Sequence, residues 1–77
     1  MEKTVKVFQK NKYQEIRVGI THYEGNDLID IRTWSQPKGS EDKLRTSKGI
    51  SINVKLYADL KTAMSLLEKE LKKNNLI

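Results

Sequence analysis

Cysteine is absent from this 77-residue chain, and histidine occurs only once, at His22. Without cysteine the protein can form neither disulfides nor thiolate metal sites, and it has no cysteine nucleophile; this composition suits a reducing compartment. One imidazole with no cluster of carboxylates around it does not make a zinc site. The sequence therefore predicts a protein that carries no metal and no other cofactor.

Long apolar runs and enzyme signatures are also missing. No stretch approaches the ~20 apolar residues that a transmembrane helix needs, and the first eight residues lack the apolar region of a secretory signal peptide. No glycine-rich phosphate-binding motif and no nucleophile-elbow motif occurs, and the few central carboxylates are scattered over turns and a strand. We expect a cytoplasmic protein with no membrane association, no small-molecule substrate and no catalytic activity.

Positive charge is what the chain has in excess. The net charge is +5 and the isoelectric point is about 9.6, a balance that favours a polyanionic partner. Residues 1–12 carry a net +3 and residues 54–77 a net +2, whereas six basic residues balance six acidic ones between 13 and 53. A binding surface in the central part therefore depends on where its cations lie and not on bulk charge.

Two alternating segments predict a β-hairpin. Polar and apolar residues alternate in Tyr13–Tyr23 and again in Leu28–Ser35, as in strands whose successive side chains point to opposite faces. The residues between them, Glu24–Asp27, are typical of a hairpin turn. Within that turn, Gly25 and Asn26 are the residues that tolerate a positive φ.

The remaining segments predict an arm, further strands and a helix. Residues 1–12 are polar and basic, as in a loosely held arm or a short edge strand. A loop with proline and glycine ends the second strand, and two short strands are expected near 42–46 and 49–52. From 54 to 73, apolar residues recur at spacings of three and four, which predicts an amphipathic helix with Asn53 as its N-cap.

These elements predict one α+β domain, in which a curved four-stranded antiparallel sheet (13–53) follows the N-terminal arm or edge strand and precedes the C-terminal helix (54–73). The helix is expected to cover the apolar face of the sheet, and His22 is expected to pack on that face as a core residue. So small a core makes oligomerisation a source of further burial. The apolar face comprises Ile16, Val18, Ile20, Ile29, Ile31, Ile50 and Ile52.

The opposite face of the sheet combines aromatic rings with cations. Unpaired bases stack on aromatic rings with roughly 1–3 kcal/mol each, and Arg and Lys neutralise the phosphates between them. Because the bases of a duplex are already stacked on one another, such a surface favours single strands. The candidate nucleic-acid-binding residues are Arg17, Tyr23, Arg32, Trp34, Lys38, Lys43, Arg45 and Lys48.

Each candidate also has a purely structural alternative. Tyr23 precedes a turn, where a tyrosine often packs across the strands, and Trp34 could be the edge of a core. Arg32 lies two residues from Asp30 on the same face, so the two could form a surface ion pair. The other cations could be solvated edge-strand charges that oppose aggregation. The residue pattern alone leaves these alternatives open.

Two motifs resemble the transcriptional coactivator family called positive cofactor four. The first is Leu-Ile-Asp-Ile-Arg at 28–32 with an aromatic residue soon after it, and the second is Lys-Gly-Ile-Ser-Ile at 48–52, followed directly by the helix. The similarity covers roughly 14–71 and is greatest to the short bacterial, YdbC-like members. It implies a homodimer joined through the C-terminal helices, whose curved sheets hold single-stranded DNA without strong sequence preference.

The resemblance also implies roles for particular residues. Tyr23 and Trp34 correspond to the base-stacking aromatics of the family, and Arg32, Lys43 and Lys48 correspond to its basic positions. Trp34 follows Arg32 by two residues, whereas the eukaryotic members have an aromatic pair one residue further on. The long serine-rich regulatory arm of those members is missing here, so the resemblance implies no control by phosphorylation.

The expected function is therefore sequence-nonspecific binding of single-stranded DNA by a homodimeric, nucleoid-associated protein that acts in transcription, replication or repair. Two alternatives remain. Single-stranded RNA could be the ligand, because no residue pattern decisively reads the 2′-hydroxyl group. The exposed aromatics could instead dock on a component of the transcription machinery, which would make the domain a protein-interaction module.

Overall fold

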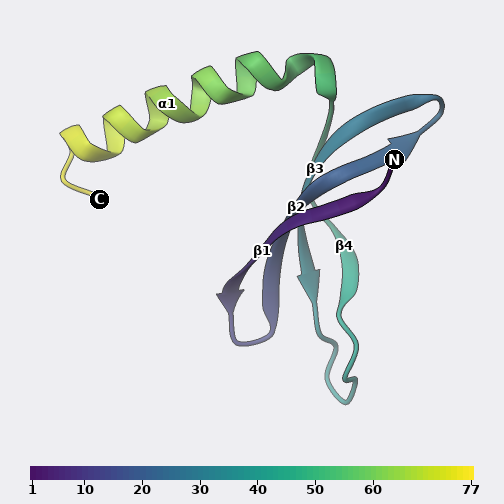
Figure 1. Ribbon diagram of the computed structural model, residues 1–77. Helices are drawn as coiled ribbons and strands as arrows, with labels where there is room; N and C mark the ends of the chain where they lie inside the picture. Colours follow the sequence, from purple (N-terminus) through teal and green to yellow (C-terminus); the bar gives the residue numbers. More distant parts are fainter.

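The computed structural model describes residues 1–77 and contains one antiparallel sheet with a helix beyond it (Figure 1). Strands follow one another in the order β1-β2-β3-β4, each antiparallel to its neighbour. The expected four-stranded curved antiparallel sheet with a C-terminal helix is confirmed. The elements are β1 (Lys3–Asn11), β2 (Gln14–Tyr23), β3 (Asn26–Ser35), β4 (Leu44–Asn53), the 3-10 turn η1 (Val54–Leu56) and α1 (Tyr57–Lys73).

The boundaries of the four strands differ from those that the sequence predicts. The N-terminal residues form β1, a nine-residue edge strand that pairs with β2 along its length. The two short strands expected later are one continuous strand, β4. The pairing of β4 with β3 is irregular at one point, because Arg32 lies opposite Gly49 while Trp34 lies opposite Arg45. The residues of β4 between Arg45 and Gly49 therefore outnumber the single residue of β3 that they face. Such a bulge bends a strand without ending the ladder.

The turn between β2 and β3 is tighter than predicted. Tyr23 pairs directly with Asn26, so the turn consists of Glu24 and Gly25 alone. These two residues have φ values of 48° and 78°, and positive φ at both positions is typical of the two-residue turns whose twist matches that of the flanking strands. Of the two residues that tolerate a positive φ, Gly25 adopts one, whereas Asn26 already belongs to β3.

Helix α1 does not pack on the sheet of its own chain. It projects away from the end of β4 (Figure 1), and none of its residues is buried. The expectation that the helix covers the apolar face within one chain is wrong. The physical reason is the short link: η1 follows β4 directly, and the Asn53 side chain accepts a hydrogen bond from the Lys55 N–H at 2.9 Å. The chain therefore has no loop after β4 that would let the helix fold back onto the sheet.

The single chain consequently has no buried apolar side chain. Only four residues are buried, and all are polar or charged: Glu15, Asp30, Arg32 and Thr33. The aliphatic face of the sheet is partly solvent-exposed, and so is the apolar stripe of α1. No helix of the structure is both long enough and apolar enough to cross a bilayer.

His22 is not a core residue, contrary to the sequence-based expectation. Its imidazole is exposed, and Nδ1 lies 3.0 Å from Oδ1 of Asp27, the residue opposite it on β3. The N-terminal ammonium donates to the same oxygen at 3.3 Å. The hydrogen bond with His22, followed by that from the N-terminus, lowers the pKa of Asp27. His22 lies at the end of β2 beyond the aliphatic residues, so no neighbour covers its ring.

Candidate nucleic-acid interface

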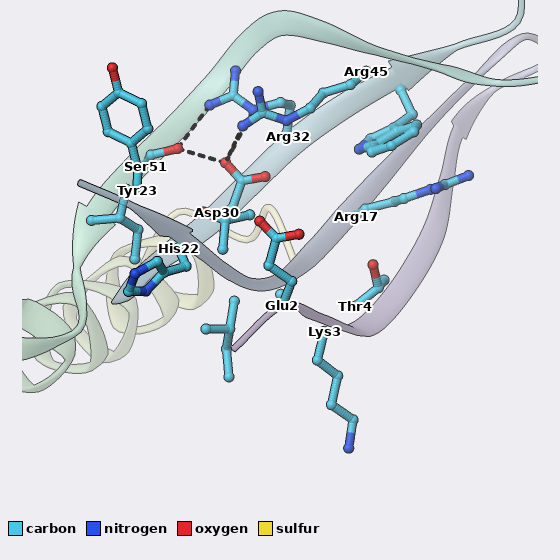
Figure 2. Close-up of a pocket in the computed structure, with 15 residues that line it drawn as sticks. Glu2, Lys3, Thr4, Arg17, His22, Tyr23, Asp30, Arg32, Arg45 and Ser51 are labelled. Atoms are coloured by element: carbon cyan, nitrogen blue, oxygen red, sulfur yellow. Dashed lines mark hydrogen bonds and ion pairs between the residues drawn. The ribbon is translucent and has the colours of Figure 1, made fainter. Parts of the chain in front are cut away.

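One face of the sheet, here called the polar face, carries the side chains of alternate residues from β2 and β3. Arg17 lies opposite Arg32, and Glu15 lies opposite Trp34, and residues that face each other across a ladder share a side of the sheet. Of these residues, Arg17, Arg32 and Trp34 border a hollow of about 730 Å³, whose lining residues are drawn in Figure 2. Its lining includes Arg17, Tyr23, Leu28, Asp30, Arg32, Trp34, Arg45 and Ser51.

Trp34 is partly exposed and carries a cation on its ring. The guanidinium of Arg17 lies 3.9 Å from the centroid of the indole, close enough for a cation–π interaction. The same guanidinium is anchored by a hydrogen bond from Nε to Oε2 of Glu15. The ring is therefore held in place without being enclosed in a core.

Tyr23 lies at the last position of β2 and lines the same hollow. The residue is 65% exposed, so its ring does not pack across the strands as the structural alternative would require. A tyrosine that leaves this much apolar ring surface in water offers a flat face to a ligand. Both aromatic candidates thus lie at the hollow of the polar face.

Four side chains from β3 and β4 form an ionic network beneath this surface (Figure 2). Oδ1 of Asp30 accepts hydrogen bonds from Arg32 Nε at 3.1 Å, Arg45 Nη2 at 3.1 Å and Ser51 Oγ at 2.7 Å. Arg32 also donates to the carbonyl oxygen of Thr46 at 3.1 Å and to Ser51 Oγ at 3.0 Å. Every buried polar atom of the network has a partner.

The ionic network keeps Asp30 charged. Burial alone would raise the pKa of this carboxyl, but the hydrogen bonds from Ser51 and Arg32, together with the charges of Arg32 and Arg45, hold the pKa below its ordinary value of 3.8. The carboxylate in turn fixes the two guanidinium groups. One side of the hollow is therefore built by charge pairing in place of apolar packing.

Arg32 and Arg45 play different parts in this network. Arg32 is only 8% exposed and uses its three guanidinium nitrogens as donors inside the sheet. The ion pair with Asp30, which the sequence offered as an alternative, exists and is buried. The Arg45 side chain is 49% exposed, so its guanidinium can meet a ligand while keeping its bond to Asp30.

Glu15 forms a second charged cluster that sequence analysis missed. Lys43 Nζ donates to Oε1 of Glu15 at 2.6 Å, and Arg17 donates to Oε2. The hydrogen bond from Lys43, then that from Arg17, lowers the pKa of Glu15 below its ordinary value of 4.5. The alternation places Glu15 on the same face as Arg17, but no pattern in the sequence signals the contact with Lys43, which comes from the loop before β4.

The two remaining candidates lie outside the hollow. Lys48 is exposed on β4 beside Gly49, where a Cβ atom would stand 2.3 Å from the carbonyl oxygen of Ile31, so only glycine fits this close approach. Lys38 lies in the loop between β3 and β4 and lines a separate hollow with Tyr13. The structure thus gathers five of the eight candidates around the main hollow, with Lys43 nearby and Lys38 and Lys48 further away.

No group of three metal-ligating side chains occurs.

The fold and the polar face define a class of protein. Residues 4–63 match the family described as Transcriptional Coactivator p15 (PC4), and the chain belongs to this family. The resemblance inferred from the two sequence motifs is therefore confirmed. Among curated proteins no significant match is found.

Solved structures of bacterial and phage relatives have the same fold. The PC4 homolog BPSL1147 from Burkholderia pseudomallei K96243, in its orthorhombic crystal form, is 30% identical, with a TM-score of 0.77 over 90% of this chain and 92% of that one. Its tetragonal form gives 29% identity and a TM-score of 0.76 over 88% and 98%. A bacteriophage T5 homolog of PC4, implicated in recombination-dependent DNA replication, shares the fold at 15% identity, with a TM-score of 0.67 over 97% and 82%.

Proposed function

We propose that the protein binds single-stranded DNA on its polar face, without strong sequence preference, and does so as a homodimer. The observation that carries this proposal is the placement of two accessible aromatic rings, Tyr23 and Trp34, on one hollow that is lined by guanidinium groups. Base stacking on the rings would supply the preference for unpaired strands. Phosphate contacts would supply most of the affinity.

The candidate cations divide into contacts and supports in this proposal. Arg45 is half-exposed, and Lys38 and Lys48 are exposed, so they can reach phosphate groups directly. Lys43 and Arg17 can do so while remaining paired with Glu15. Buried Arg32 acts by holding Asp30 and the β3–β4 ladder in place, and its direct contact with DNA is at most an edge of the guanidinium.

A homodimer is supported by the apolar surface that one chain leaves uncovered. The sheet carries a face of isoleucine and valine side chains, and η1 and the helix present an apolar stripe that includes Leu56, Tyr57, Met64 and Leu67. Apolar area left in water weakens a fold by roughly 25 cal/mol per Å², and a domain of this size has little else to stabilise it. Pairing two copies through their helices removes this surface from water.

The test is a titration of fluorescently labelled oligo-dT, followed by anisotropy, in parallel with a duplex and an oligo-U of equal length. We expect tight binding to oligo-dT, weaker binding to duplex, and affinity that falls with salt at a slope of about −0.7 per phosphate contact. A mass measurement in the same buffer should give twice the chain mass. Equal or tighter binding to oligo-U would make RNA the ligand, and weak, salt-insensitive binding would instead favour a protein-interaction module.

The process in which the protein acts is proposed at the level of the family: transcription, replication or repair, at the nucleoid in the cytoplasm. Membership of a transcriptional coactivator family supports this assignment. Each of these processes exposes single-stranded DNA, which is the ligand of the proposed binding mode. The oligonucleotide titration tests the binding mode independently of the process.

A further inference from the structure

We propose that Tyr13 is a third base-stacking position, which extends the bound single strand past Trp34 to the end of the sheet opposite Tyr23. This inference rests on the proposed function. Tyr13 lies in the turn before β2 and Tyr23 is the last residue of β2, so ten residue steps of ~3.3 Å separate them by roughly 33 Å. Tyr13 and Tyr23 would then stack bases at the two ends of the bound strand, and Trp34 would stack a base between them.

Two loops meet at the Tyr13 end of the sheet. The turn between β1 and β2 and the loop between β3 and β4 both lie at the end away from the β2–β3 turn (Figure 1). The hydrogen bond from the Gln36 N–H to the Tyr13 carbonyl oxygen extends the β2–β3 pairing by one residue beyond Gln14 and Ser35. Tyr13 therefore follows the row of Glu15 and Arg17, and Gln36 follows the row of Trp34. The polar face of the sheet therefore ends at Tyr13 and Gln36.

Hydrogen bonds hold the backbone of Tyr13 in position. Its N–H donates to Oδ1 of Asn11 at 3.1 Å, and its carbonyl oxygen accepts from the Gln36 N–H at 2.9 Å. The Gln36 side chain in turn donates to the Ser40 carbonyl oxygen at 2.7 Å. The turn is thus tied to the facing loop, and a ring mounted on it needs little ordering when a ligand arrives.

The Tyr13 ring is exposed and carries a cation, as the Trp34 ring does. The residue is 57% exposed, and Lys12 Nζ lies 5.5 Å from the centroid of its ring, within cation–π range. Arg17 is placed likewise over Trp34. A cation on one side of a ring leaves the other side for a base.

A hollow of about 420 Å³ adjoins the Tyr13 ring and is lined by Tyr13, Gln36, Pro37, Lys38, Gly39 and Ser40. Lys38 brings a second exposed cation to it, suited to the phosphate of the stacked nucleotide. Single exposed aromatics are common on protein surfaces. Here the ring combines a cation partner, an adjoining hollow with a lysine and a fixed backbone, and it continues the face that already carries two such rings.

The experiment compares wild type, Tyr13→Ala and Tyr13→Phe with a series of labelled dT oligomers from about 4 to about 16 nucleotides, the range of site sizes found for sheet-based single-strand binders. We expect Tyr13→Ala to bind the shortest oligomers as wild type does and the longest ones about 5- to 150-fold more weakly, the loss of one stacked base. Tyr13→Phe keeps the ring and should match wild type at every length.

The outcomes separate this inference from the proposed function. If wild type binds the whole series and Tyr13→Ala matches it at every length, the subsite is refuted while the proposed function stands. An equal loss at all lengths, which Tyr13→Phe does not restore, would also refute it, because the residue would then be structural. If wild type binds no oligomer, the proposed function itself fails and this inference fails with it.

Discussion

The guanidinium of Arg17 lies 3.9 Å from the centre of the Trp34 ring, although the two residues belong to different strands and do not face each other in the ladder. Arg17 pairs with Arg32, and Trp34 pairs with Glu15, so the contact is a diagonal one between neighbours on the same side of the sheet. Glu15 binds the same guanidinium and opposes its thermal reorientation. The central ring of the polar face is thus oriented before any ligand is present.

Removal of either exposed ring should weaken binding with little effect on the fold. Tyr23→Ala and Trp34→Ala should each reduce the free energy of oligo-dT binding by about 1–3 kcal/mol. Tyr23→Phe retains the stacking surface and is the matched control. Anisotropy titrations give the affinities, and urea denaturation of each variant checks that the domain is intact. Unchanged affinity in both alanine variants would rule out stacking on this face.

Substitutions of Arg32 and Arg45 should differ in their effects on stability and on oligo-dT binding. Arg32→Ala breaks a buried ion pair and leaves Asp30 with fewer donors, so we expect the free energy of unfolding to fall by about 3 kcal/mol. Arg45→Ala removes a half-exposed partner of the same carboxylate and should lower it by less than about 1 kcal/mol, while weakening oligo-dT binding. Urea midpoints at one fixed protein concentration make the comparison. Equal destabilisation by both variants would contradict the assigned roles.

Lys48 should act on binding through charge alone. Its side chain is exposed and makes no ion pair, so Lys48→Gln should leave the urea midpoint unchanged. The slope of log affinity against log salt should become shallower by about 0.7, the value for one phosphate contact on a single strand. Lys61→Gln on the helix removes the same charge away from the polar face and is the control. A slope that does not change would exclude Lys48 from the phosphate path.

Acid should destabilise the protein through the carboxylates of the polar face. The folded-state pKa values of Glu15 and Asp30 lie below their ordinary values of 4.5 and 3.8. The folded state therefore binds fewer protons than the unfolded state below about pH 5, so stability is full above this range and is lost as the pH falls through the folded pKa values. Urea midpoints between about pH 6 and about pH 3 measure this loss.

Glu15→Gln should flatten that pH dependence, because the amide does not titrate. Glu41→Gln removes an exposed carboxylate that makes no ion pair and is the control. If the two variants and the wild type lose stability in parallel as the pH falls, then Glu15 does not contribute to the acid sensitivity. Asp30→Asn offers an independent comparison within the buried network.

Two adjacent leucines of α1 should differ in their effect on assembly. Leu67 belongs to the apolar stripe, whereas Leu66 lies outside it, and both residues are exposed in the single chain, by 47% and 60%. Leu67→Glu should lose at least about 2–3 kcal/mol of burial per copy and shift the protein to monomers in a mass measurement over a range of concentrations. Leu66→Glu should leave the mass unchanged. The opposite result would move the proposed interface to the other side of the helix.

Local patterns in the sequence predict the strands of the central hairpin, the helix and the division of the sheet into two faces. The alternation in β2 and β3 correctly predicts that Tyr23, Trp34 and Arg17 share a side, because side-chain direction follows from backbone geometry alone. The predicted turn, Glu24–Asp27, is two residues longer than the observed one, since Asn26 and Asp27 pair with Tyr23 and His22. Pairing is a property of two strands together and is not contained in either one.

Contacts between distant segments are what the sequence does not predict. The continuity of β4 depends on a bulge stabilised by Thr46, whose hydroxyl donates to the Thr33 carbonyl oxygen at 2.7 Å. The hydrogen bond from Lys43 to Glu15 joins residues 28 positions apart. The burial of Arg32 follows from its partners on β4. Each of these depends on tertiary geometry, for which composition and periodicity carry no signal.

Because every water-excluded residue of the single chain is polar, the two sides of this one-layer sheet have unrelated chemical requirements. Salt and pH act on the ionic side, whereas the apolar side responds to dilution and temperature. In the proposed binding mode, substitutions on the apolar side can therefore alter self-association without changing the residues proposed to contact DNA, and the reverse holds as well. An engineer could retune the affinity for nucleic acid in such a scaffold while keeping its quaternary structure constant.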